Sequence, residues 1–247
     1  MSMGTAQWRT GRSQAGGAGA EGLRERKKRL MREQLTDTAT EMFVERGFDA
    51  VRVSEIAEAC GVSEKTVFNY FPTKESLLLD RFDGTMTALR AGLAEPGVPP
   101  VEAALRILDA ELAAMTSWLA AQDDPAPAIA RTLRFRDLIR STPALRAHQH
   151  DLADRLVATA AQVLARRSGP GLGLDPDPDD PEPRIAATAL IGLWRIQFQS
   201  LRRHLGGDPT PTPAQLYEAV STDVRRAARL IDTGLRSFAI PPVAARP

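Results

Sequence analysis

The sequence predicts an all-α protein, and three observations lead to that prediction. Apolar residues recur at steps of three and four along most of the chain, which is the spacing of one face of a helix. No segment alternates apolar and polar residues as a half-buried strand does. Glycine and proline cluster between the periodic segments, where they end helices and form turns. With 43% hydrophobic residues among 247, the chain has enough apolar material for a core.

Composition and charge limit the class of protein. No run of about eighteen apolar residues occurs, so we expect no membrane contact. The lone cysteine, Cys60, excludes an internal disulfide framework and fits the reducing cytoplasm. Residues 1–32 carry eight basic and two acidic residues, a net charge of +6, which leaves −5 for the remainder of a chain whose total is +1. A basic arm on an acidic body is typical of proteins that bind polyanions, and a solvated tail is the alternative.

The chain divides into four predicted parts: a disordered basic arm (1–22), a first helical domain (23–82), a second helical domain (83–240) and a disordered tail (241–247). The first helix is predicted from about residue 23 to 46, where a glycine ends it.

Two short helices follow in the first domain. The second helix spans about 53–60, and Gly61 supplies a left-handed turn. Ser63 is a good N-cap for a third helix that reaches Tyr70. Pro72 stops it, and Thr73 caps a fourth helix that carries three leucines and Phe82. Two short helices joined by a glycine turn match the helix-turn-helix plan, whose second helix enters the major groove of DNA.

The third helix has two chemically distinct faces. At about 100° per residue, Val67 and Phe71 lie on one side and suit a small core. Asn69 has the amide that reads adenine, and Lys65 suits guanine or a phosphate. The opposite side carries a cation, a hydroxyl, an amide and a phenol: Lys65, Thr66, Asn69 and Tyr70.

Residues 27–82 resemble the DNA-binding domain of the TetR family of bacterial transcriptional regulators. The resemblance is carried by "AVRVSEIAEACGVSEKTVFNYFPTKESLL" and by "FVERGF" at the end of the first helix. It implies that Phe68 and Tyr70 line the DNA side or its edge and that Lys74 clamps a phosphate. Arg52 stands where the family usually has a capping Thr or Ser; it can replace a phosphate contact but cannot cap. Arg26 and Lys27 belong to a basic segment that would add phosphate contacts or reach the minor groove.

The second domain is predicted to be entirely helical. Apolar residues from Val101 to Leu119 step by three and four over at least five turns. Further helices are expected at about 128–140, 143–167, 184–204 and 212–238, with a Gly/Pro/Asp loop before the fourth. The resemblance implies a ligand pocket among the middle helices and a homodimer formed through the last two.

A small-molecule effector is therefore expected in the second domain. Each large apolar side chain taken alone is a core residue, whereas the set fits a pocket. The set comprises Met115, Trp118, Phe135, Leu138, Trp194 and Phe198. Polar groups that could meet a ligand are supplied by Arg131, Arg134, Arg195 and Gln197, and the sequence does not select among them.

Catalytic, metal and cofactor sites find no support in the sequence. His148 and His150 lie about 200° apart on a helix and cannot share a metal ion. The resemblance implies a dimeric regulator of a palindromic operator, with repression as the usual outcome and activation as the alternative. A ligand-independent regulator, or a helical small-molecule-binding protein without operator specificity, are the competing hypotheses.

Overall fold

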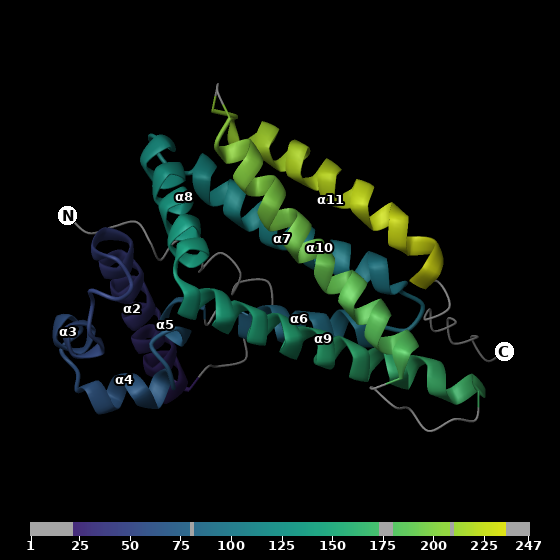
Figure 1. Ribbon diagram of the computed structural model, residues 1–247, viewed down its shortest axis with the longest axis horizontal. Coiled ribbons are helices and arrows are strands. Elements are labelled where there is room, and N and C mark those ends of the chain that lie inside the picture. The colour runs from purple at the N-terminus through teal and green to yellow at the C-terminus, as the bar shows by residue number, and fades with distance from the viewer. Residues whose placement is uncertain (1–21, 80–81, 173–179, 208–209, 236–247) are drawn as a thin grey trace. The chain divides into compact units, whose positions relative to one another are not determined.

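The computed structural model describes residues 22–79, 82–172, 180–207 and 210–235, and every regular element in these ranges is an α-helix (Figure 1). The predicted all-α class is confirmed. In chain order the helices are α2 (Leu23–Arg46), α3 (Val53–Ala59), α4 (Glu64–Tyr70), α5 (Ser76–Leu79), α6 (Phe82–Ala94), α7 (Pro100–Ala120), α8 (Ala126–Ser141), α9 (Pro143–Leu172), α10 (Pro181–Leu205) and α11 (Pro213–Leu235). The predicted arm before residue 22 and the tail after 240 lie outside the described ranges.

The helices form two compact units. The first unit contains α2 to α5 together with Ser117–Gln149, which includes α8; α8 packs against α2. The second unit contains Phe82–Thr116 and the chain from His150 onward, and α10 packs against α11 in it. The predicted functional boundary after residue 82 stays a prediction, because it concerns what each part binds and not how compactly it folds.

The first unit is built on one stripe of α2. Leu35, Ala39 and Phe43 recur every four residues, so they share a face, and each is 0% exposed. Ile56 of α3 and Val67 of α4 complete this core at 0% and 1% exposed. The short helices α3 and α4 could not persist alone; α3 packs on α2 and α4 packs on α3, and these contacts hold them.

Turn chemistry separates these helices. Gly47 has a φ of 89°, which suits glycine, and its N–H donates to the Phe43 carbonyl at 2.9 Å to end α2. Thr73 and Ser76 exchange backbone-to-hydroxyl hydrogen bonds, each 3.2 Å long, at the start of α5. This confirms the predicted cap at Thr73. The helix after it is only one turn long, however, and Phe82 begins α6 instead of extending the same helix.

The second unit has a leucine-rich core drawn from every one of its helices. α10 is buried on several sides, as its apolar sequence predicts. The Arg167 guanidinium donates to the carbonyls of Leu93 and Val98 at 2.6 Å each, which ties α9 to the end of α6 and to the connection that precedes α7. The largest core residues of this unit include Leu89, Leu93, Leu108, Leu112, Leu156, Leu164, Leu190, Trp194 and Val220.

Several helices begin earlier or end later than predicted, and proline explains the early starts. Pro127 and Pro181 lie in the first turns of α8 and α10, where a residue without an N–H loses no intrahelical hydrogen bond. The predicted starts near 128 and 184 treated these prolines as breakers. α9 also extends to Leu172, five residues past the predicted end, so the loop before α10 is shorter than expected.

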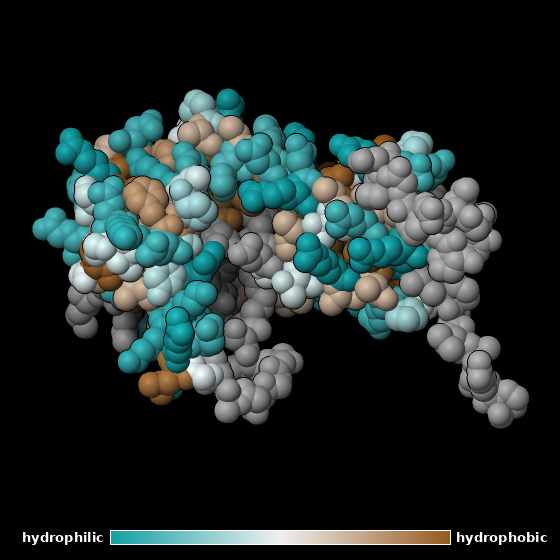
Figure 2. Space-filling view, turned by 90° about the horizontal axis from the view of Figure 1, so that it is seen from below, coloured by the Kyte–Doolittle hydropathy of each residue, from teal (hydrophilic) through white to brown (hydrophobic). Residues whose placement is uncertain are grey.

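No described helix is long and apolar enough to cross a membrane. Hydrophilic residues cover most of the face seen in Figure 2, and hydrophobic residues lie among them singly or in small groups, without forming a continuous band.

Candidate nucleic-acid interface

The turn between α3 and α4 is set by local chemistry. Gly61 has a φ of 68°, in the left-handed region that favours glycine. The Val62 N–H donates to the Ala57 carbonyl at 3.0 Å, closing the turn. The Ser63 hydroxyl then accepts the Thr66 N–H at 3.1 Å as the N-cap of α4. Both predicted roles, the glycine turn and the serine cap, are confirmed.

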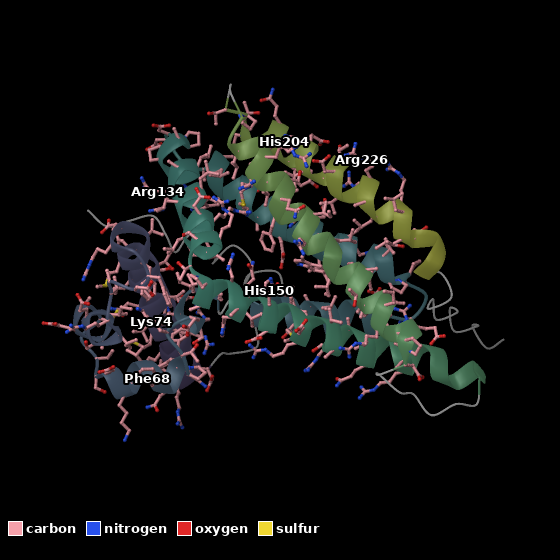
Figure 3. All side chains as sticks on the ribbon, viewed as in Figure 1. Phe68, Lys74, Arg134, His150, His204 and Arg226 are labelled. Atoms are coloured by element: carbon pink, nitrogen blue, oxygen red, sulfur yellow. The ribbon has the colours of Figure 1, made fainter. Side chains whose placement is uncertain are left out.

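The two faces of α4 are separated as the sequence predicts. Val67 and Phe71, the residue that follows α4, are 1% and 0% exposed. Lys65, Phe68 and Asn69 are exposed, and the Phe68 side chain is 44% exposed (Figure 3). The exposed face of α4 therefore offers a cation, an aromatic ring and an amide together, a combination that suits a contact with DNA.

Thr66 and Tyr70 lie at the margins of the exposed face and are half-buried. The Thr66 hydroxyl is 2.8 Å from the Ser63 hydroxyl, so it takes part in the cap. The Tyr70 carbonyl accepts a hydrogen bond from Arg32 at 3.2 Å, and the same guanidinium lies 4.8 Å from the centre of the Phe71 ring. Arg32 thereby links the end of α4 to α2.

Arg52 is exposed at the N-cap of α3 and makes no capping hydrogen bond, as predicted. Its backbone N–H donates instead to Glu55 at 2.7 Å, and the other Glu55 oxygen accepts from Arg46 at 2.6 Å. Two hydrogen bonds hold the pKa of Glu55 below its usual value. The bond from the Arg52 backbone has the larger effect, and the bond from the Arg46 side chain has the next largest. Sequence reasoning missed Glu55; the signal was a glutamate three residues after the cap position. The guanidinium of Arg52 remains at the surface.

Lys74 lies differently from what its predicted role requires. Its ammonium donates to the Phe48 carbonyl at 2.6 Å and lies 4.4 Å from the Phe48 ring centre and 5.4 Å from that of Phe43. Burial lowers the pKa of Lys74. In this structure the side chain therefore joins the start of α5 to the turn after α2. A phosphate contact by Lys74 stays a prediction, and the hydrogen bond that this side chain makes to Phe48 lies inside the unit.

The remaining predicted DNA contacts are on α2. Arg26 and Lys27 are exposed in the first turns of this helix. Most of the basic arm before them lies outside the described residues.

The six predicted pocket residues fall in both compact units. Trp118, Phe135 and Leu138 belong to the first, where Trp118 is buried and the other two are half-buried. Met115, Trp194 and Phe198 belong to the second, where Met115 and Trp194 are buried and Phe198 is 38% exposed. The Trp194 indole N–H donates to Glu111 at 3.2 Å. The membership of this set in one pocket stays a prediction.

Other chemistry is limited in the part of the chain that the structure describes. Among those residues, no group of three or more His, Cys, Asp and Glu side chains is placed to hold a metal ion. Cys60 is 8% exposed and lies in the core.

Comparison with known proteins identifies the N-terminal domain. Residues 35–80 match the family model described as "Bacterial regulatory proteins, tetR family". The HTH-type transcriptional regulator TcmR of Streptomyces glaucescens is 29% identical over 161 residues, which cover 61% of this chain and 66% of that protein, just under two thirds of its length. The HTH-type transcriptional regulator LuxR of Vibrio harveyi is 47% identical over 47 residues, 19% of this chain and 23% of that protein.

A solved structure of NalD, the secondary repressor of the MexAB-OprM multidrug efflux pump in Pseudomonas aeruginosa, is 20% identical with a TM-score of 0.47, covering 81% of this chain and 97% of that one. The family match spans α3, the turn and α4, and so includes the exposed face described above. Through residues 35–80, which contain the helix-turn-helix segment, the chain matches the TetR family of bacterial regulatory proteins.

Proposed function

We propose that this protein is a sequence-specific DNA-binding transcriptional regulator of the cytoplasm, a repressor that leaves its operator when a small molecule binds. The observation that carries the proposal is the division of α4: an apolar side that is completely buried, and an opposite side on which Lys65, Phe68 and Asn69 are exposed together. This is the arrangement that a helix needs to enter the major groove while remaining fixed to its own domain.

Each exposed group has a matching partner in the groove. The Asn69 amide can donate to and accept from one adenine edge. Phe68 suits the methyl group of thymine, and Lys65 suits a guanine edge or a phosphate oxygen. Arg26, Lys27 and the Arg52 guanidinium would add phosphate contacts, which raise affinity without selecting sequence.

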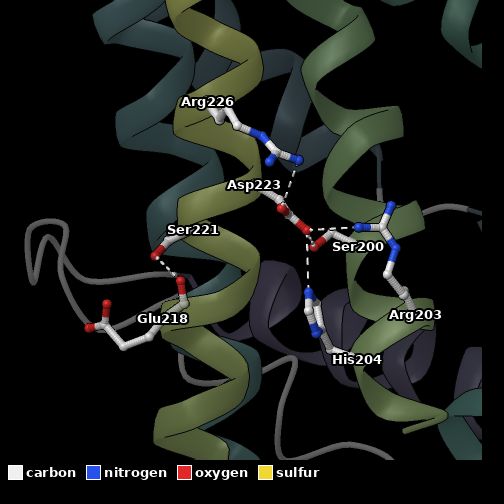
Figure 4. A network of polar contacts seen from close by, with 7 residues as sticks. All are labelled: Ser200, Arg203, His204, Glu218, Ser221, Asp223 and Arg226. Carbon is white, nitrogen blue, oxygen red and sulfur yellow. Dashed lines mark hydrogen bonds and ion pairs between the residues drawn. The ribbon is translucent and has the colours of Figure 1, made fainter.

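A homodimer through α10 and α11 would place two such helices on one operator. The two helices are joined at Asp223, which accepts from the Ser200 hydroxyl at 2.7 Å and lies 3.3 Å from the His204 ring and 3.4 Å from the Arg203 guanidinium (Figure 4). Large apolar residues remain exposed on this pair: Ile185 of α10 is 67% exposed, and Leu230 of α11 is 86% exposed. A second subunit that covered them would bring two α4 helices to half-sites about 34–36 Å apart, on a near-palindromic site.

Release by an effector requires that the effector bind one conformation more tightly than the other. Two helices provide a covalent route for such coupling, because α7 and α9 each contribute residues to both compact units. The residues of α7 before Ser117 belong to the second unit, and those from Ser117 onward belong to the first. A ligand that shifts the earlier residues of α7 therefore acts on a helix that continues into the first unit.

The test is binding of the full-length protein to DNA fragments flanking its own gene, measured by fluorescence anisotropy across a salt series. We expect one fragment to be preferred and affinity to fall steeply with salt. Asn69→Ala should weaken binding to the preferred fragment by about 1–3 kcal/mol and relax the preference. Gln162→Ala, which removes an exposed amide from α9, is the matched control and should change nothing. Equal binding to every fragment, with no effect of Asn69→Ala, would contradict the proposal.

A further inference from the structure

The second unit contains a pocket, partly open to solvent, that is bordered by α7, α10 and α11. Its volume is about 230 Å³, and none of the six predicted pocket residues lines it. Its apolar lining comes from Leu105, Leu108, Leu112 and Val224. Because a water molecule occupies about 30 Å³ of liquid, the space suits a molecule of roughly eight non-hydrogen atoms.

The charged residues that line the pocket neutralise one another. Arg106 donates to Glu102 at 2.6 Å, and Arg225 donates to Asp109 at 3.3 Å. Asp109 also accepts a hydrogen bond from the Tyr217 hydroxyl at 2.5 Å. Two cations and two carboxylates thus give no net charge, and each is engaged by a partner. The pocket therefore offers an ionic ligand no unpaired opposite charge.

Gln197 supplies the polar feature that sets this pocket apart. The residue is 5% exposed and lines the pocket from α10. Within the described ranges, its side-chain amide makes no hydrogen bond. The amide atoms are not sealed from solvent, so they face the open space of the pocket. A bound molecule with a hydrogen-bonding group would supply a partner there. Of the four polar residues that the sequence left open, Gln197 is the one that lines this pocket; Arg134 and Arg195 are exposed and Arg131 is half-buried.

We propose that this pocket binds a small, neutral, largely apolar molecule whose single hydrogen-bonding group pairs with the Gln197 amide. The apolar part would rest on the leucines and Val224. This inference deepens the proposed function, on which it rests for its regulatory meaning, since such a molecule would be the effector. Binding at α7 would also act on one of the two helices that contribute to both units.

Indole and indene are matched probes for this pocket, because they have nearly the same shape and only indole carries an N–H. Affinities of both probes would be measured by isothermal titration calorimetry on the full-length protein. We expect wild type to bind indole about 2- to 10-fold more tightly than indene, the range expected for one neutral hydrogen bond. Gln197→Leu should remove that difference, and Leu105→Trp should abolish binding of both probes by filling the pocket.

Two controls keep the result interpretable. Gln162→Leu changes an exposed amide on α9 and should leave both affinities unchanged. Thermal unfolding without ligand reports the fold: Gln197→Leu should melt no lower than wild type, because the amide that it removes makes no hydrogen bond within the described ranges. A clearly lower melting temperature would show that Gln197 has a structural partner and would overturn the inference. So would failure of wild type to bind indole, or binding that neither pocket substitution alters.

Operator binding in the same preparations separates this inference from the proposed function. A preferred DNA fragment that wild type binds, with no binding of indole, would overturn the pocket alone. Indole binding that depends on Gln197, without any DNA preference, would support the pocket and contradict the regulator. Weakening of operator binding by indole in wild type, and not in Leu105→Trp, would support both.

Discussion

Replacing Lys74 by methionine separates two roles for this lysine. The structure places its ammonium 2.6 Å from the Phe48 carbonyl and over the rings of Phe43 and Phe48, whereas the resemblance assigns it to a DNA phosphate. Methionine keeps most of the alkyl chain and removes the charge and the donors. The substitution therefore tests the hydrogen bond and the cation–π contacts with little change in packing.

The magnitude follows from the lost contacts. A hydrogen bond from a charged donor contributes about 1.5–3 kcal/mol, and the contacts with the aromatic rings add roughly 0.5–1 kcal/mol. Burial lowers the pKa of Lys74, which shows that desolvation of the ammonium offsets part of this gain. We expect a net loss of about 1–2 kcal/mol in the free energy of unfolding. For a chain of this length that corresponds to a melting temperature lower by roughly 2–8 °C.

The assay pairs thermal unfolding with the salt dependence of DNA binding. Lys65→Met is the matched control, because Lys65 is exposed on α4 and makes none of these contacts. Lys74→Met should lower the melting temperature, with no change in the slope of log K against log salt. Lys65→Met should preserve the melting temperature and, if Lys65 meets a phosphate, reduce the slope by about one. An unchanged melting temperature in Lys74→Met, with a slope reduced by about one, would refute the structural role.

Three further predictions concern stability. Ser63→Ala should cost about 1 kcal/mol in urea unfolding and weaken DNA binding, because α4 loses its N-cap; a loss no larger than that of an exposed serine elsewhere would contradict this. Arg167→Met should cost about 2–3 kcal/mol, because two backbone carbonyls lose a charged donor, and Arg167→Lys should recover only part. The Ser200 hydroxyl, more than the neighbouring cations, lowers the pKa of Asp223, so its stabilisation is present at neutral pH and is lost as pH falls through about 4 and below. Asp223→Asn should be less stable at pH 7 and should flatten that acid loss, and an unchanged pH profile would count against the network.

Some parts of the candidate site follow directly from local sequence. The Gly61 turn, the Ser63 cap and the division of α4 into two faces depend on residues within one or two turns of each other. Steric limits on φ and the geometry of a single helix are enough to predict them. The prolines at the starts of α8 and α10 were misread because proline is tolerated in a first turn and excluded from later ones. Composition alone cannot tell a proline in the first turn of a helix from a proline that ends a helix until the start of the helix is known.

The sequence by itself determined the all-α class, the helix-turn-helix segment and the chemistry of the exposed face of α4. Each of these depends on the spacing of residue types along the chain, and that spacing is the same whatever the tertiary structure. Only the tertiary structure decided that Lys74 turns toward the Phe48 carbonyl, or that Gln197 is buried beside a neutral pocket. Those outcomes depend on residues that are far apart in the chain: Lys74 and Phe48 are 26 positions apart, and α7 and α11 meet across more than 100 residues at Asp109 and Tyr217. Which residues are buried, and which partners they contact over such distances, is set by how the helices pack. The periodicity of residues within one helix does not predict that packing.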